Sequence, residues 1–588
     1  MVSRRLAPCG SLARPRGASY TPLHGEQAPG HSVQTHVGFT EIYMVGRVTR
    51  LTPRRVRRAV WLWPLLAFGI GVLIRLPLWR MVKYPGWGDY AFYYTVASNL
   101  VAGRGFVIDY IWHFWSRPES LTHYSNDYWL PLTSVILSAF MGILGNTLQG
   151  AVMASIVFGT SLGLLAYIMA WRRTRSLFVA LSAMLLTLSN ASLFTYSLIT
   201  DTPVFYAFFA GWALFFMAEA VRNRRQAFRY LGGAALCTAL ANMTRQDGIL
   251  LVFLLSLAAW IGEKTGRGRR LAWVWSLYMV GMLPLWALNM VYMGRPVAGN
   301  TFTTMFFRDY SDMYAYSRTI DWNYYVSWGL ANIVRSKVYA LAFNARTLYN
   351  HLPALMWALV AAGWASGLAR YRRRFTSRAG LATWDLHLWA WGFLGLLYGV
   401  YSLIFTFPGI QGGFLRSSMA VLPFVMVLVA ETVYRHVHPR WLAGVFMGVS
   451  IALLTYHSYT AARYTIVSNT RAGEALARIV PLLEAAGYDR DEVVLMTIAP
   501  WEAHVATGFK TIQIPTEDRD TIYFVAQRYG ATHLLLPAKR DRFQALYEGR
   551  EADPRFVLEG EVPNSPLKVY RIIYPAAEDA SEAPTEPP

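Results

Sequence analysis

The chain has 588 residues, of which 54% are hydrophobic and only 15% are charged, and its mean hydropathy is +0.28. This composition excludes an ordinary soluble globular protein and predicts an integral membrane protein with many spans and interfacial aromatic residues. The net charge of +21 arises from Arg and Lys in short loops between apolar runs. That placement indicates orientation in the bilayer and contact with anionic lipid, and it excludes a nucleic-acid partner. Cys9 and Cys237 provide neither a disulfide framework nor metal-ligand spacing.

The first segment, residues 1–58, is rich in Arg, Gly and Pro and shows no sustained apolar periodicity. We expect it to be disordered and cytoplasmic. Met44 precedes a basic run and would be a more ordinary start, so an over-extended start is an open alternative. The apolar run that follows is long enough to span a bilayer, which argues against a cleaved signal peptide.

Transmembrane spans are predicted wherever about 20 apolar residues follow one another, and the basic loops between them are expected to face the cytoplasm. Run length and basic loops together predict about eleven spans, with the N-terminus inside and the C-terminus outside the cell. The expected spans are 60–80, 150–171, 176–195, 203–221, two short helices within 230–262, 271–293, 352–369, 384–407, 417–434 and 441–458.

Two regions depart from this simple pattern. Residues 131–145 are apolar but too short to span, so we interpret them as a re-entrant or interfacial helix within a large outer loop, residues 81–149. The apolar stretch 230–262 is interrupted by Arg245 and Asp247. We expect two short helices whose turn reaches the outer face, where ionisable residues at membrane depth usually serve function. The alternative is an Arg–Asp ion pair that only holds the helix hairpin together.

After the last span the composition becomes that of a soluble domain. A helical run at 471–487, an amphipathic stretch at 518–529 and strand-like runs at 492–497, 532–537 and 567–572 predict a small α/β fold. The expected fold class is therefore an α-helical polytopic membrane protein with a small C-terminal α/β domain outside the membrane. The expected domains are 59–460 in the membrane, 461–575 outside it, and a disordered tail, 576–588.

Asp89 is the first candidate for chemistry. It follows a Gly-rich turn, is the only acid in residues 81–108, and precedes a helical run, 90–102, that Gly103 closes. We expect this helix to lie on the membrane surface. The alternative is that Asp89 only caps the helix, because Asp satisfies a free N–H at that position.

Three further candidates lie on the expected outer face. Asp201 immediately precedes a span that starts with Pro203, so it could act in catalysis or only complement the helix dipole. Asp127 opens the helix at 131–145 and could equally be its N-cap. Arg416 lies where an outer loop enters a span, and an interfacial anchor is the alternative.

These residues together resemble the GT-C superfamily of polytopic glycosyltransferases, in particular the bacterial protein O-mannosyltransferases and lipid A aminoarabinose transferases. The resemblance covers roughly residues 60–460. Asp89 resembles the acid of the family's first-loop motif, although Tyr90 replaces the usual Glu. Asp201 resembles the second-loop acid, and the turn containing Arg245 resembles the family's Thr-Arg-Pro-Glu-Gly turn. Arg416 falls where the family has Arg-Tyr, with Ser417 in place of that Tyr.

The resemblance implies transfer of a sugar, with inversion, from a polyprenyl-phosphate carrier to an extracytoplasmic protein, lipid or cell-envelope glycan at the plasma (inner) membrane. It implies that Asp89 is the general base and that Asp201 orients the acceptor or holds a metal. A divalent metal ion is compatible with such a site but is not required. The residues implied to bind substrate or its phosphate are Arg104, Asp127, Arg245, Arg416, Tyr90 and Tyr93.

Two other classes of protein remain open. A transporter or flippase of lipid-linked glycans would show repeat symmetry and matching broken helices, neither of which is visible in the sequence. A glycan polymerase or ligase shares the carrier and the side of the membrane and differs only in the acceptor. The sequence identifies neither the sugar nor the acceptor.

Overall fold

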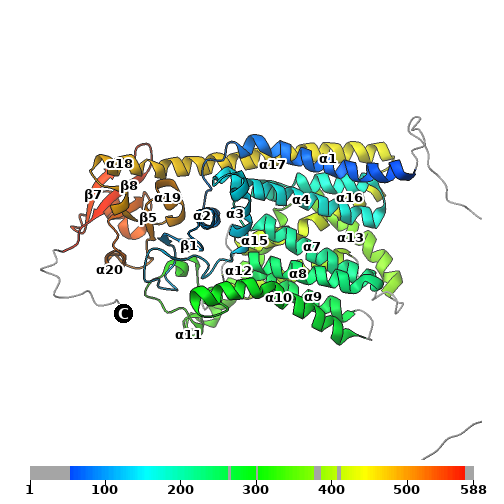
Figure 1. Ribbon diagram of the computed structural model, residues 1–588, viewed down its shortest axis with the longest axis horizontal. Coiled ribbons are helices and arrows are strands. Elements are labelled where there is room, and N and C mark those ends of the chain that lie inside the picture. The colour runs from blue at the N-terminus through cyan, green and yellow to red at the C-terminus, as the bar shows by residue number, and fades with distance from the viewer. Residues whose placement is uncertain (1–52, 262–265, 299–301, 376–385, 407–411, 576–588) are drawn as a thin grey trace, which may run out of the picture. The chain divides into compact units, whose positions relative to one another are not determined.

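The structure is a computed structural model that describes residues 53–261, 266–298, 302–375, 386–406 and 412–575 (Figure 1). Disorder was expected for residues 1–58 and 576–588, of which 1–52 and 576–588 lie outside the described residues. Residues 53–58 are not disordered, because they form the start of α1 (Pro53–Trp79). Residues from Arg57 onward form a single unit.

Long helices form most of this unit, because extended apolar runs satisfy their backbone hydrogen bonds internally as helices. Seven helices in the described part of the chain are long and apolar enough to cross a membrane, so this is a multi-pass membrane protein. They coincide with seven of the expected spans. The other four are also helical, namely α5, α8, α9 and α13, but are shorter or less apolar. The principal helices are α1 (Pro53–Trp79), α4 (Leu148–Thr174), α5 (Leu177–Leu188), α7 (Pro203–Arg222), α8 (Ala227–Thr244), α9 (Leu250–Ile261), α10 (Arg267–Met293), α13 (Ala354–Phe375), α14 (Leu386–Leu403), α16 (Leu422–His436) and α17 (Arg440–Ala477).

The predicted outer-loop helices are present. The run at 90–102 is α2 (Asp89–Val101), and the short apolar helix at 131–145 is α3 (Leu132–Leu144). However, α2 does not lie exposed on a surface, since residues on all its sides are buried, including Tyr90 and Phe92. Its neighbours are α3 and α19 (Pro500–Thr507), so the C-terminal part of the chain covers the face expected to meet lipid or water.

The C-terminal region contains a six-stranded sheet with the order β2-β5-β4-β6-β8-β7. The predicted strands are β4 (Val494–Thr497), β6 (His533–Pro537) and β8 (Leu567–Ile572), and the sequence analysis missed β5 (Lys510–Gln513) and β7 (Phe556–Glu561). The helices of this region are α18 (Ile479–Ala485), α19, α20 (Arg519–Tyr529) and α21 (Gln544–Tyr547).

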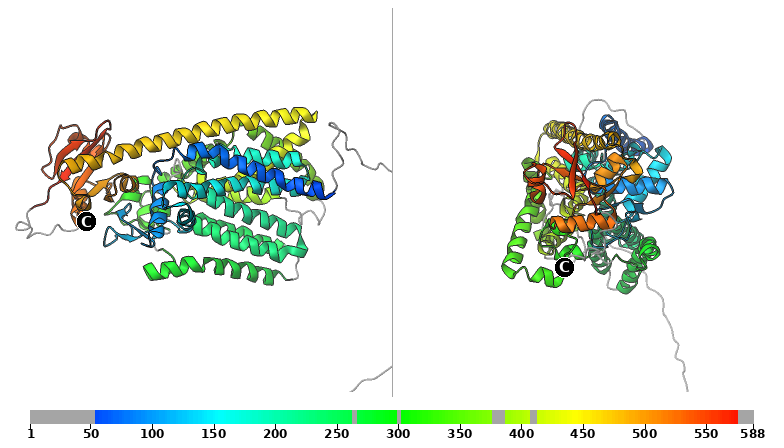
Figure 2. Two further views of the ribbon diagram at one scale, coloured as in Figure 1. Left: turned by 45° about the horizontal axis from the view of Figure 1, so that its top comes forward. Right: turned by 90° about the vertical axis from the view of Figure 1, so that its left-hand side faces the viewer.

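The edge strand β2 (Tyr110–Ile111) comes from the first outer loop and pairs in parallel with β5. In addition, α17 runs without interruption from the helical bundle to the C-terminal sheet, as Figure 1 and the left view of Figure 2 show from the side. The first outer loop and the C-terminal region therefore share one sheet.

Shorter elements complete the connections between the helices. They are β1 (Val107–Ile108), β3 (His123–Tyr124), α6 (Ala191–Tyr196), η1 (Arg224–Gln226), η2 (Gln246–Ile249), η3 (Thr303–Phe306), η4 (Tyr310–Tyr314), α11 (Trp322–Val326), α12 (Leu330–Tyr349), α15 (Gly413–Ser418), η6 (Met419–Val421), η7 (Arg490–Glu492) and η8 (Asp541–Phe543).

Candidate functional site

Asp89 is the first residue of α2, and its carboxylate forms an ion pair with the guanidinium of Arg416. The N-cap of α2 is Gly88, and no side chain caps this helix. Asp89 thus does not have the capping role that was its structural alternative. Its side chain is 21% exposed, so it lies at the edge of the buried cluster described below.

Asp201 lies in the turn between α6 and α7 and is fully buried. Its Oδ1 accepts the Thr202 N–H at 2.6 Å, which fits the expected position at the start of a helix. Its Oδ2 lies 3.2 Å from Nε of Arg416. Burial raises the pKa of Asp201 to about 6, while the hydrogen bond from the Thr202 N–H acts in the opposite direction.

Arg416 therefore lies between the two candidate acids. Its side chain is only 13% exposed, so it is not the interfacial anchor that was the alternative interpretation. It is carried by α15, whose first residue, Gly413, lies so close to Tyr401 that a Cβ would be 2.3 Å from the tyrosine oxygen. Glycine at this position lets α15 approach α14.

Arg245 lies in the turn between α8 and η2, and its guanidinium has several partners. Nε lies 3.2 Å from Asp247 Oδ1 and donates to Ser417 Oγ at 3.0 Å, while Nη1 donates to Thr202 Oγ1 at 3.1 Å. The turn can fold back on α8 because Gly248 has no Cβ, which would come within 2.5 Å of backbone atoms of Asn242. The ion pair proposed as the structural alternative exists, but it is one of several contacts.

Two hydroxyl groups that the sequence analysis did not assign complete this cluster. Tyr401 donates from its hydroxyl to Asp247 Oδ2 at 3.0 Å, and the Ser417 hydroxyl contacts the same oxygen. Ser417 could have been found from its position beside Arg416, whereas Tyr401 lies inside an apolar span without any local signal. We call Asp89, Asp201, Asp247, Arg245 and Arg416 the acid–arginine cluster.

The two tyrosines expected to bind substrate lie next to this cluster and are buried. The Tyr90 ring has the guanidinium carbon of Arg416 6.0 Å from its centroid. Tyr93 packs edge-on against Phe92 at a centroid distance of 5.2 Å. Burial and then the charge of Asp201 raise the pKa of the Tyr93 hydroxyl well above its ordinary value.

Arg104 is not brought into the cluster. Its guanidinium forms two hydrogen bonds with Asp109, at 2.7 and 2.9 Å, and its side chain is 45% exposed. Burial would raise the pKa of Asp109, but hydrogen bonds from Arg104 and Thr122 hold it below its ordinary value. Arg104 therefore serves a loop ion pair within the same outer loop.

Asp127 also lies apart from the cluster. Its Oδ2 is 3.2 Å from His113 Nε2, and both side chains are largely buried. The N-cap of α3 is Pro131, so Asp127 does not cap that helix either. The structure gives Asp127 a place in the packing of the outer loop.

The donor groups do not fit a divalent metal. A guanidinium of Arg416 lies between Asp89 and Asp201, where a cation shared by the two carboxylates would have to sit. Among the described residues, no three Asp, Glu, His or Cys side chains converge on one point. We therefore derive no step through a metal ion.

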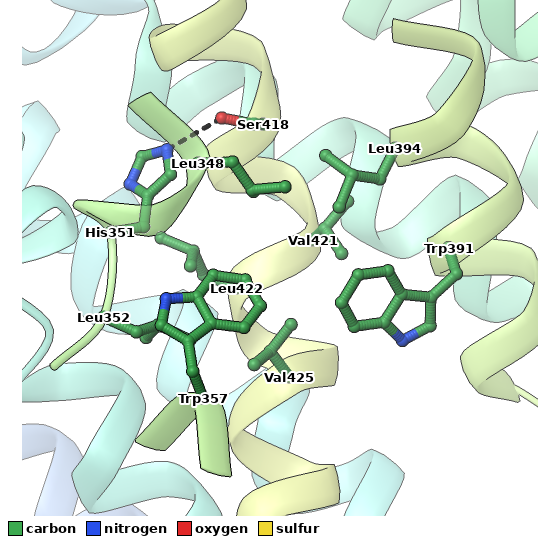
Figure 3. Close-up of a pocket in the computed structure, with 10 residues that line it drawn as sticks. All are labelled: Leu348, His351, Leu352, Trp357, Trp391, Leu394, Ser418, Val421, Leu422 and Val425. Carbon is green, nitrogen blue, oxygen red and sulfur yellow. Dashed lines mark hydrogen bonds between the residues drawn. The ribbon is translucent and has the colours of Figure 1, made fainter. Parts of the chain in front are cut away.

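A small apolar hollow, with a volume of about 10 Å³, lies next to Ser418, which is two residues after Arg416 in the chain (Figure 3). Its polar groups are His351 and Ser418, joined by a hydrogen bond of 2.8 Å. Burial lowers the pKa of His351 to about 4, so the imidazole is neutral at pH 7. The apolar lining of the hollow is Leu348, Leu352, Trp357, Trp391, Leu394, Val421, Leu422 and Val425.

No protein-family model and no curated protein matches the sequence. Solved structures do match the fold. ArnT from Cupriavidus metallidurans bound to undecaprenyl phosphate superimposes with a TM-score of 0.55 and 13% identity, covering 87% of this chain and 98% of ArnT. The apo form of ArnT matches with the same TM-score and coverage and 15% identity. The apo oligosaccharyltransferase of Archaeoglobus fulgidus has a TM-score of 0.51 and 13% identity, covering 81% of this chain and 69% of that protein.

The likeness to these solved structures concerns the fold alone, and the GT-C resemblance in the sequence motifs predicts such a fold. This chain has a fold similar to theirs: a polytopic helical membrane protein with a small C-terminal sheet region.

Proposed function

We propose that this protein is a membrane glycosyltransferase that moves a sugar from a polyprenyl-phosphate donor to an acceptor hydroxyl, with inversion at the anomeric carbon. The observation that carries this proposal is the position of Arg416 between Asp89 and Asp201. Such a transfer requires a base and a cation that binds the phosphate. In this cluster the candidate base and the candidate cation are in direct contact. The GT-C fold supports the same conclusion, since ArnT was solved with undecaprenyl phosphate bound.

In the proposed reaction, the acceptor oxygen attacks the anomeric carbon while the bond from that carbon to the phosphate oxygen breaks. The acceptor proton passes to the Asp89 carboxylate, and the polyprenyl phosphate leaves with the bonding electrons. Asp201 is fully buried and orients Arg416 from the other side. Arg245 is the second candidate for the phosphate, because its fork of N–H groups suits phosphate oxygens.

Arg416 is engaged by acids before any donor arrives, and this suggests how the base becomes available. A phosphate that enters the cluster competes with the more exposed of the two acids, Asp89, for the Arg416 guanidinium. Asp201 is fully buried and keeps its contact. Phosphate binding in this way frees the Asp89 carboxylate to accept a proton next to the anomeric carbon.

The side of the membrane follows from the basic residues. The span α7 begins beside Asp201 and ends at Arg222, and α16 follows the Arg416 segment and has Arg435 in its last turn. The cluster therefore lies at the helix ends opposite to these arginines. By the positive-inside rule the cluster and the C-terminal sheet face the extracytoplasmic side of the plasma membrane, with the N-terminus in the cytoplasm. We propose that residues 59–460 form the membrane domain and that residues 461–575 form the outer domain.

Asp89→Asn tests this function. Asparagine keeps the size of the side chain but cannot accept the proton, so we expect transfer to fall about 10²–10⁴-fold with the fold intact. The assay follows transfer from a radiolabelled polyprenyl-phosphate sugar in membranes that contain equal amounts of each protein. Glu474→Gln is the matched control. Glu474 is an exposed acid that pairs with Lys83, and Lys83 immediately precedes the turn that leads to Asp89.

Retention of more than about a tenth of wild-type transfer would exclude Asp89 as the base, since removing a base costs more than that. Asp201 would then be the candidate. Movement of an intact lipid-linked glycan across the bilayer, without transfer, would instead identify a transporter.

A further inference from the structure

The turn that presents Asp89, residues 84–88, is held by the extension of α17. The Tyr84 ring lies flat against Gly473, where a Cβ would be 2.2 Å from Cγ of the ring. Pro85 is the next residue of the turn, and its carbonyl oxygen accepts a hydrogen bond of 3.5 Å from Nδ2 of Asn469, which also belongs to α17. Gly86, at φ +95°, lies so close to the Asn469 amide that a side chain would clash with it. Three consecutive residues of the turn thus rest on one helix.

A second helix, α19, contacts the same turn through a carboxylate. Glu502 Oε1 accepts the Gly88 N–H at 2.8 Å. Gly88 is the residue immediately before Asp89 and is the N-cap of α2, with φ +41°. Oε2 of Glu502 is buried and makes no hydrogen bond among the described residues. Oε1 is therefore the oxygen through which Glu502 contacts the turn.

The helix that carries Glu502 is itself fixed against the first outer loop. The Trp501 ring packs on Trp112 and Trp129, with centroid distances of 5.7 and 6.3 Å, respectively. The adjoining β5 pairs with β2. Aromatic packing and strand pairing thus fix the position of Glu502 relative to α2. A hydrogen bond to a carboxylate is also stronger than one between neutral groups.

We propose that Glu502 is a positioning residue for Asp89: it holds the Gly88 N–H, and through it the first turn of α2, so that the C-terminal domain completes the candidate active site. The role of Asp89 as base rests on the proposed function, whereas the positioning of the turn does not. Burial raises the pKa of Glu502 to about 7. Because the carboxyl accepts this hydrogen bond in either protonation state, the proposal requires an acceptor oxygen and not a charge.

The test uses the full-length protein in detergent and compares Glu502→Ala with Glu502→Gln. Glu517→Ala is the matched control, since Glu517 Oε1 accepts the Tyr316 N–H at 2.9 Å and the Ser317 N–H at 3.3 Å from a different outer segment. Hydrogen exchange is measured by mass spectrometry. We expect Glu502→Ala to speed exchange about tenfold or more in peptides covering 84–92, and Glu517→Ala to do so only in peptides covering 310–318. Glu502→Gln, whose amide oxygen can accept the same bond, should exchange like the wild type.

The second measurement is transfer kinetics. A misplaced base lowers the rate of the chemical step more than it lowers binding, so Glu502→Ala should reduce kcat about 10–100-fold with KM for the donor within about twofold. Glu502→Gln should stay within about threefold of wild type, as should Glu517→Ala. If Glu502→Ala is not recovered folded, Glu502→Asp, which draws the acceptor back by one methylene, replaces it in both measurements.

Unchanged exchange at 84–92 in the alanine variant would overturn the proposal. An equal loss of kcat in Glu517→Ala would also overturn it, because the effect would then be general destabilisation of the domain. If the wild-type protein transfers no sugar, the proposed function fails, and the exchange measurement still decides whether Glu502 holds the turn.

Discussion

The acid–arginine cluster differs instructively from a second buried cluster at the basic ends of the helices. There, Glu431 is only 1% exposed and is paired with Arg173 at 2.5 Å and with Arg435 at 2.9 Å. One acid has two arginines and both of its oxygens accept hydrogen bonds. In the acid–arginine cluster three acids share two arginines, and the Arg416–Asp201 pair lacks hydrogen-bond geometry.

The difference indicates different roles. A buried acid whose oxygens are fully bonded to cations is a stable end point, and removing it leaves uncompensated charge. A cluster with excess acid and an incompletely bonded arginine can exchange one partner for an incoming anion at a lower cost. We therefore interpret the Glu431 cluster as a structural tie between α4 and α16, and the acid–arginine cluster as the place where ligand exchange occurs.

Glu431→Ala tests whether the two clusters have different roles. Loss of the acid removes the carboxylate that two half-buried guanidinium groups contact, so we expect the free energy of unfolding to fall by about 1–3 kcal/mol. Transfer per folded molecule should be unchanged. Thermal unfolding in detergent, with activity normalised to folded protein, measures both. A loss of specific activity comparable to that of Asp89→Asn would mean that the two clusters are not functionally distinct.

Exchanging Arg245 and Asp247 separates phosphate binding from a simple ion pair. Each single charge reversal should reduce transfer about 100-fold, which is the scale of losing one transition-state contact. The double exchange should not restore it, because Arg245 also donates to Ser417 and Thr202, which the exchanged guanidinium would leave. Full recovery in the double variant would show that the ion pair alone matters.

The buried carboxyl of Glu502 predicts how stability depends on pH. Its pKa is raised from an ordinary 4.5 to about 7 by burial, so between those values the folded protein holds a proton that the unfolded chain has lost. Stability should therefore fall as the pH rises from about 4.5 to 7, by at most about 3 kcal/mol. Glu502→Gln lacks this dependence and should be the more stable protein at pH 8. Melting curves of both proteins at pH 5 and pH 8 measure it, and parallel shifts would contradict it.

The smallest effect is expected for Arg104→Gln. The Arg104–Asp109 pair is largely exposed on the Arg104 side, and such pairs contribute about 0–1 kcal/mol. Transfer should stay within about twofold of wild type and stability should change by less than about 1 kcal/mol. A tenfold loss of transfer would instead support Arg104 as a ligand of the phosphate, which is the role that the family resemblance implies.

The fold was largely predictable because membrane spans and outer-loop helices depend on local apolar runs. The helix at 90–102, the short helix at 131–145 and the turn at Arg245 were found from composition, spacing and flanking charge alone. Asp89, Asp201 and Arg416 were identified separately, and the structure brings them together.

The contacts that were not predicted join distant parts of the chain. Glu502 lies in a helix without any motif, and nothing near residue 502 indicates that it reaches Gly88. Tyr401 is similar, as one aromatic residue among many in an apolar span. Arg104 is close to Asp89 in sequence, but the structure pairs it with Asp109, a partner that the sequence analysis did not identify.

The pairing of β2 with β5 has a consequence for how the protein is made. Tyr110 and Thr511 are register partners although they lie about 400 residues apart in the chain, so ribosomes complete nearly the whole protein before this pair can form. Until then the first outer loop lacks the strand partner that fixes β2. A nascent chain arrested before β5 would already contain α17 and Glu502, which contact the Asp89 turn, but its β2 would have no strand to pair with. The first outer loop, which carries the proposed base, is thus fixed to the C-terminal sheet only at the end of biogenesis.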